Sequence, residues 1–167
     1  AYRREYLEVP LHHDVFPAHI YPFAGIFKKH KCVFLKDYTV AVGIQDSQTR
    51  FVSSIYDNSP TESWVSMFNI VFSEEEFSQQ RKWGNENITS NYVGLVQLKN
   101  YAKPGVLWRE ILLLVKYRKK NLYAPLFWFF SIGCLIIPRI ILVKLVDQYK
   151  IKVNSNLLQS IKFNHTL

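Results

Sequence analysis

The chain has 167 residues, of which 49% are hydrophobic and 20% charged, and its formal net charge at pH 7 is +8. This length suits one small domain with an attached segment, and a count of two cysteines excludes a disulfide-stapled scaffold. The basic charge would suit nucleic acid, anionic lipid or an acidic protein. No helix-turn-helix, zinc-finger or RNA-binding motif is present, so nucleic acid is not an expected partner.

Residues 1–30 are rich in proline and aromatic side chains. Pro10, Pro17 and Pro22 lie too close together for a regular helix or a central strand. Disordered segments are poor in aromatic residues, so we expect this N-terminal arm to lie in a groove of its own domain or of a partner.

Residues 31–104 predict a small mixed β/α domain outside the membrane. Runs of β-branched and aromatic residues at 33–44, 50–56, 64–72 and 92–98 favour strands. Ser73 and the three glutamates after it are typical of a helix start, and Gly84 with Asn85 would end that helix. Pro104 and Gly105 separate this domain from the next segment.

Residues 105–149 predict two helices, an amphipathic one at about 106–115 and a transmembrane one at about 123–146. The second run is apolar on every side, which is typical of a helix inside a bilayer or buried in the core of a large protein. A chain of 167 residues is small for enclosing such a helix, so the bilayer is the expected surrounding and a buried core helix is the alternative. A hydrocarbon core of about 30 Å needs about 20 helical residues, and the run supplies them. Residues 150–167 form a polar C-terminal tail.

The expected functional positions all lie in or beside this run. Pro138 should kink the helix, while Tyr123 and Trp128 suit the headgroup region. The basic side chains on both flanks predict contacts with lipid headgroups or a role in topology, and Arg139 could instead pair with a carboxylate of another subunit. They are Lys116, Arg118, Lys119, Lys120, Arg139 and Lys144.

No catalytic, metal or cofactor motif stands out. The histidines at 12, 13, 19 and 30 and Cys32 do not have the spacing of a standard zinc site. The glutamates at 74–76 are explained as charges at a helix start, and no glycine-rich phosphate-binding motif occurs. We therefore expect a protein that is not an enzyme and has no cofactor.

The sequence as a whole predicts an α+β protein: the proline-rich arm, a small β-rich extramembrane domain, an amphipathic helix and one transmembrane helix. The expected function is that of a non-catalytic accessory subunit, which scaffolds a membrane complex such as a respiratory-chain complex or ATP synthase. Its expected partners are other membrane subunits and the bilayer, including anionic lipids.

The expected location is the mitochondrial inner membrane, since no disulfide framework or signal peptide is visible. The glycosylation patterns at Asn87 and Asn164 keep the endoplasmic reticulum as an alternative. Two other functions remain open. One is a membrane-tethered metal protein or enzyme that uses the N-terminal His/Cys cluster, and the other is an endomembrane adaptor that binds peptides at a sheet edge.

Overall fold

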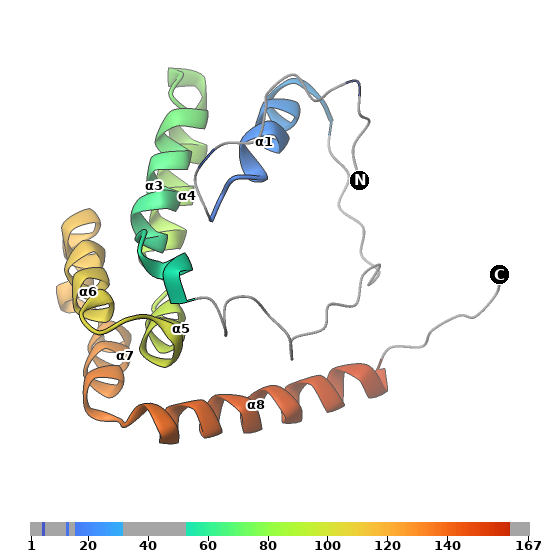
Figure 1. Cartoon of the computed structure of the whole chain (residues 1–167). Coiled ribbons are helices and arrows are strands. Elements are labelled where there is room, and N and C mark those ends of the chain that lie inside the picture. The colour runs from blue at the N-terminus through green and yellow to red at the C-terminus, as the bar shows by residue number, and fades with distance from the viewer. Residues whose placement is uncertain (1–4, 6–12, 14–15, 32–52, 161–167) are drawn as a thin grey trace.

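The structure, a computed structural model, describes residues 5, 13, 16–31 and 53–160. These residues are mainly helical, and Figure 1 shows how the helices are arranged. The elements in chain order are α1 (Ile20–Lys29), η2 (Ser53–Tyr56), α3 (Pro60–Val71), η3 (Glu75–Phe77), α4 (Ser78–Thr89), α5 (Val93–Tyr101), α6 (Val106–Tyr117), η4 (Lys119–Tyr123), α7 (Pro125–Ile136) and α8 (Arg139–Ser160), where η denotes a 3₁₀-helix.

The predicted β-rich domain is wrong for the described part of the chain, where no strand occurs. The expected strands at 64–72 and 92–98 are the helices α3 and α5. The expected strand at 33–44 lies outside the described residues, and residues 53–56 form η2. A sheet edge that could bind a peptide is therefore not found in the described ranges.

Helix α3 begins where Ser59 and Pro60 favour a helix N-terminus. Ser59 Oγ accepts the backbone N–H of Glu62 at 3.0 Å, and Pro60 occupies the first turn, where no N–H is needed. Helices α1, α4 and α6 pack on different sides of α3. Its buried residues therefore do not form a single helical stripe: Thr61, Ser63, Val65 and Met67 alternate along the chain, as the buried residues of a strand would.

Helix α5 was also predicted as a strand, although its buried residues have a helical spacing. Its buried residues Leu95 and Leu98, with Tyr92 directly before the helix, are spaced by three, which is a helical spacing. A strand would have buried residues 92, 94, 96 and 98 together, but Gly94 is exposed and Leu95 is buried. The alternation in the sequence is therefore misleading.

Gly84 lies inside α4 and does not end it. Helices α3 and α4 run side by side (Figure 1), and a Cβ atom at position 84 would overlap the ring of Phe68. The glycine therefore permits close approach of the two helices. Next to it, Asn85 Nδ2 donates to Asn69 Oδ1 at 2.9 Å.

Helix α1 forms despite the prolines of the predicted arm. Pro22 is the third residue of α1, and the first N–H groups of a helix have no intrahelical acceptor, so proline costs little there. Pro17 precedes the helix, and its carbonyl accepts the N–H of Ile20 at 2.8 Å. The expectation that these prolines forbid a helix is therefore wrong.

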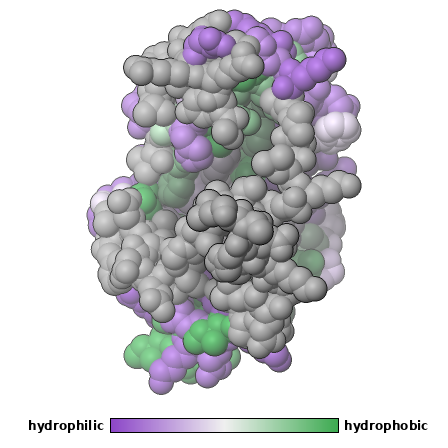
Figure 2. All heavy atoms as spheres, turned by 90° about the vertical axis from the view of Figure 1, so that its right-hand side faces the viewer, coloured by the Kyte–Doolittle hydropathy of each residue, from purple (hydrophilic) through white to green (hydrophobic). Residues whose placement is uncertain are grey.

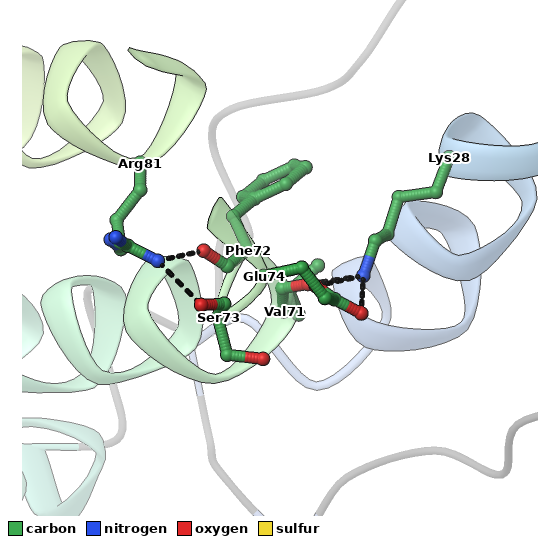
Figure 3. A network of polar contacts seen from close by, with 6 residues as sticks. All are labelled: Lys28, Val71, Phe72, Ser73, Glu74 and Arg81. Atoms are coloured by element: carbon green, nitrogen blue, oxygen red, sulfur yellow. Dashed lines mark hydrogen bonds and ion pairs between the residues drawn. The ribbon is translucent and has the colours of Figure 1, made fainter. Parts of the chain in front are cut away.

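Polar contacts hold the end of α3 to α1 and α4, as Figure 3 shows. Lys28 Nζ donates to the Val71 carbonyl at 2.8 Å and pairs with Glu74 at 2.7 Å. The hydrogen bond from Lys28 lowers the pKa of the Glu74 carboxyl. From the other side Arg81 donates to the carbonyls of Phe72 and Ser73, so the last turn of α3 has acceptors for two cations.

The hydrophobic core lies between η2, α5, α6, α7 and α8. The ring of Tyr92 meets Phe127 edge to face, with ring centroids 5.6 Å apart. Leu95, Ile111 and Leu114 belong to the same cluster and bring α5 and α6 together. Leu142 adds α8 to this cluster, so the inner side of α7 and the start of α8 are both anchored in it.

A buried asparagine connects the ends of four elements. Asn121 in η4 is 0% exposed. Its Oδ1 accepts from the Tyr92 hydroxyl at 2.8 Å and from Arg118 at 2.7 Å. Its Nδ2 donates to the carbonyls of Thr89 and Leu114, both at 2.9 Å. The amide therefore makes all four of its hydrogen bonds and fixes the end of α4, the start of α5 and the end of α6 around η4.

We predict that Asn121→Ala lowers the free energy of unfolding by about 2–4 kcal/mol, since each buried group left without a partner costs about 1–3 kcal/mol. Urea unfolding followed by circular dichroism measures the change. Asn87→Ala, at an exposed position of α4, is the matched control and should stay within about 0.5 kcal/mol. A loss below about 1 kcal/mol for Asn121→Ala would contradict this role.

Two helical glycines give a second prediction. Gly84→Ala should destabilise the protein by about 1–3 kcal/mol, because the added methyl group meets the Phe68 ring. Gly94→Ala meets no atom within 4 Å and should stabilise the helix by up to about 1 kcal/mol. Thermal unfolding of the two variants measures both changes in stability. Equal effects of the two substitutions would disprove the close approach of α3 and α4.

Candidate functional site

The apolar run at 123–146 is divided into two helices by Pro138. Proline disfavours the helical conformation of the residue before it, and Ile137 is extended with ψ 127°. Helix α7 therefore ends at Ile136, where a continuous kinked helix was expected. Helix α8 begins at Arg139, and Figure 1 shows it running off in a different direction from α7.

This break removes the predicted transmembrane helix. Helix α7 has 12 residues and is about 18 Å long, against about 30 Å of hydrocarbon. Helix α8 has 22 residues, but Asp147, Lys150 and Lys152 make its second half polar. Within 16–31 and 53–160, no helix combines the length and the apolarity needed to cross a bilayer. The predicted single-pass anchor and the integral-membrane locations based on it, mitochondrial or endoplasmic-reticulum, are therefore wrong.

Helix α7 has an inner and an outer face. Phe127, Ser131 and Cys134 are buried on the inner face, against α5. The outer face is apolar and exposed: Phe129 is 72% and Ile136 75% accessible to solvent. We call this outer face and its continuation on α8 the α7–α8 ridge; it consists of Leu126, Phe129, Ile132, Ile136, Ile140 and Ile141.

Basic and aromatic side chains surround the ridge. Lys119 and Lys120 are exposed in η4, before α7, and Arg139 and Lys144 are exposed on α8. Figure 2 shows apolar and hydrophilic residues next to each other at the lower end of the molecule, the level of α8 in Figure 1. Residues 111–146 contain six lysines and arginines and no aspartate or glutamate, so nothing within this stretch neutralises the charge.

The predicted anchor residues do not all have the same surroundings. Lys116 is exposed at the end of α6, with its Nζ 5.2 Å from the centre of the Tyr117 ring. Arg118 is half-buried and donates to Asn121 and Tyr92, so its guanidinium is part of the internal network. Arg118 therefore has a structural role that its place in a basic cluster does not reveal.

The predicted interfacial aromatics lie at the start of the ridge. Tyr123 is 87% exposed, and Trp128 is partly exposed. Trp128 Nε1 donates to the Leu122 carbonyl at 2.9 Å, so the indole is fixed beside η4. Tyrosine and tryptophan, which combine an apolar ring with one polar group, are common at surfaces that become buried on binding.

Two polar residues that sequence reasoning missed lie inside the protein. Glu110 belongs to the expected amphipathic helix, where a charged residue would face solvent, yet it is 3% exposed and accepts hydrogen bonds from Ser59 and Thr61. Asn121 directly follows the basic cluster at 116–120. The place of Asn121 between two apolar runs could have indicated that it is buried. Its partners Thr89 and Tyr92 could not be inferred in this way, because they come from another part of the chain.

The histidines are not assembled into a metal site in the described part of the chain. His13, His19 and His30 are exposed, and the ranges that the structure describes hold no group of three His, Cys, Asp or Glu suited to a metal. His12 and Cys32 lie outside these ranges. A metal site that includes them stays a prediction.

Comparisons with known proteins identify no relative. No family model matches the chain, and neither a curated protein nor a solved structure is similar to it. The site must therefore be interpreted from its own geometry.

The reactivity of introduced and natural cysteines tests which face of α7 is packed. Burial raises the pKa of the Cys134 thiol to about 11, although the nearby charge of Lys99 lowers it in part. In a Cys32→Ser background at pH 8, Cys134 should react with a disulfide reagent roughly a hundredfold more slowly than an ordinary thiol.

The matched control removes Cys134 as well and carries Ile136→Cys on the exposed face. Its thiol should react at the ordinary rate in the folded protein, and both variants should react alike in urea. Similar rates for the two variants without urea would show that the assignment of inner and outer faces is wrong.

Proposed function

We propose that the chain is a non-catalytic accessory subunit that attaches to another protein of a hetero-oligomeric assembly through the α7–α8 ridge. The observation that supports this is the exposed apolar surface of α7, which continues onto α8 without an intervening charged residue other than Arg139. Contiguous apolar surface of this kind is rare on a monomer and marks a site of binding.

The charge around the ridge favours an acidic partner over a second copy of the chain. A symmetric dimer would place the ridge against itself, and with it Lys119, Lys120, Arg139 and Lys144 of both copies. Like charges across an interface are unfavourable. Arg139 also begins α8 at its positive end, and the first turns of α7 and α8 contain no acidic residue. Carboxylates on a partner would relieve this unfavourable arrangement.

The shape of the ridge favours a groove in a protein over a flat lipid surface. Helix α5 contacts both α7 and α8 and so lies on the inner side of their bend. Ile136 and Ile140, one on each side of the bend, are both largely exposed, so these side chains are not covered by α5. A convex helical edge fits a groove, as in other complexes in which a helix supplies apolar anchors to a partner.

Two substitutions on the ridge test the proposal. Phe129→Asp combined with Ile136→Asp should weaken attachment at least tenfold, because burying an unpaired carboxylate costs more than the roughly 1.4 kcal/mol that a factor of ten represents. Both side chains are exposed, so circular dichroism and thermal unfolding of the chain alone should change little. The readout is sedimentation of the chain in extracts of the cells that produce it, at native abundance.

Trp83→Asp is the matched control, since Trp83 is an exposed aromatic residue on α4 outside the ridge. The control should sediment with the assembly like the unchanged chain. If the unchanged chain sediments as a lone protein of 19.7 kDa, the proposal fails. It also fails if the double variant stays in the assembly, or if the ridge instead carries the chain onto vesicles of anionic phospholipid.

A further inference from the structure

A pocket of about 260 Å³ lies between α3, α5 and α6, away from the ridge. Its wall is mostly apolar and includes the aromatic side chains of Phe16, Tyr56 and Trp64. Leu95 and Leu114 contribute aliphatic surface from α5 and α6. A pocket of this kind takes a small molecule, and its few polar groups determine which one.

Among the described residues, the one acidic side chain in this wall is Glu110, from α6. Its Oε2 accepts the hydroxyl of Ser59 at 2.7 Å, and its Oε1 accepts the backbone N–H of Thr61 at 2.8 Å. A carboxylate has about four acceptor positions, so about two remain unused. The first turn of α3 stabilises this carboxylate through its partial positive charge.

Glu110 lacks a cationic partner among the described residues. The adjacent Arg109 donates to the carbonyls of Tyr56 and Asp57 at 3.2 and 2.9 Å. Lys103 pairs with Asp57 at 2.9 Å. Buried carboxylates are normally paired with a cation or coordinate a metal. A side chain of 3% exposure, with no lysine, arginine or histidine paired with it in this part of the chain, is an exception.

We propose that this pocket binds a small organic amine in its ammonium form, with the charged group at Glu110 and the apolar part among the aromatic rings. The ammonium would donate a charge-assisted hydrogen bond to the carboxylate, and the rings of Tyr56 and Trp64 would attract it through their π faces. No residue of the ridge lines this pocket, and the proposal does not rest on the proposed docking function.

The experiment uses two probes of nearly equal shape, benzylamine and the neutral benzyl alcohol. Titration is followed by NMR through the Thr61 amide, which donates to Glu110, and the indole N–H of Trp64, since both residues line the pocket. Benzylamine should bind at least tenfold more tightly than benzyl alcohol and should shift both signals. Equal affinity of the two probes, or no binding of either one, would overturn the proposal.

Gly94 allows the pocket to be filled without disturbing the core. It lies in the pocket wall, and a Cβ atom there meets nothing within 4 Å. Gly94→Leu should weaken benzylamine binding at least tenfold. Gly133→Leu is the matched control, because this helical glycine on α7 has equally open space and is not in the wall. Equal affinity of the Gly94 and Gly133 variants would place the amine elsewhere and overturn the site.

The role of the carboxylate is tested by Glu110→Gln, which keeps the shape and removes the charge. The preference for benzylamine over benzyl alcohol should disappear in this variant, while the alcohol binds as before. A preserved preference would show that Glu110 does not recognise the ammonium. If the variant does not fold, the Gly94 pair and the two probes still decide between the outcomes.

Discussion

The arrangement of the helices depends most on the side-chain amide of Asn121. Its four hydrogen bonds reach the last carbonyl of α4, the hydroxyl of Tyr92 before α5, and two groups at the end of α6. An apolar residue of similar size could fill the space but would leave these groups without partners in a dry interior. Because η4 leads directly into α7, the same amide also sets where the α7–α8 ridge begins.

A second constraint acts at Pro138. The apolar run at 123–146 was expected to form one continuous helix, but it forms two helices with a bend between them. Proline removes one N–H and also restricts the residue before it, and the second effect ends α7 at Ile136. The carbonyl of Pro138 then accepts the N–H groups of Ile141 and Leu142, both at 3.1 Å, so the new helix starts at once. The outward side chains on both sides of the bend remain exposed.

The features that could be predicted from the sequence are mostly local. The helix expected at 106–115 is α6, which begins after Gly105 in its left-handed conformation. The basic and aromatic residues around the ridge can be read directly from the chain.

The strands expected at 64–72 and 92–98 were wrong because α3 is covered on several sides and because the buried residues of α5 are spaced by three. Gly84 resembles a helix C-terminus in the sequence, because the contact that requires a glycine there is with Phe68, sixteen residues earlier. The pocket could not be predicted at all, because Glu110 meets its partners only in the folded chain.

Helix α6 connects the two surfaces to which we assign binding. Its first half holds Glu110 against the start of α3, and its last turn ends at the Asn121 amide. Leu114 takes part in both contacts of α6: it lines the pocket, and its carbonyl accepts a hydrogen bond from Asn121 Nδ2. A close-packed interior transmits displacement, so the position of α3 on α6 and that of α7 on α5 are not independent. A ligand in the pocket could affect the ridge only as far as it binds one arrangement of these helices better than another. The complete hydrogen bonding of Asn121 favours a single arrangement, and this argues for two sites on one rigid frame.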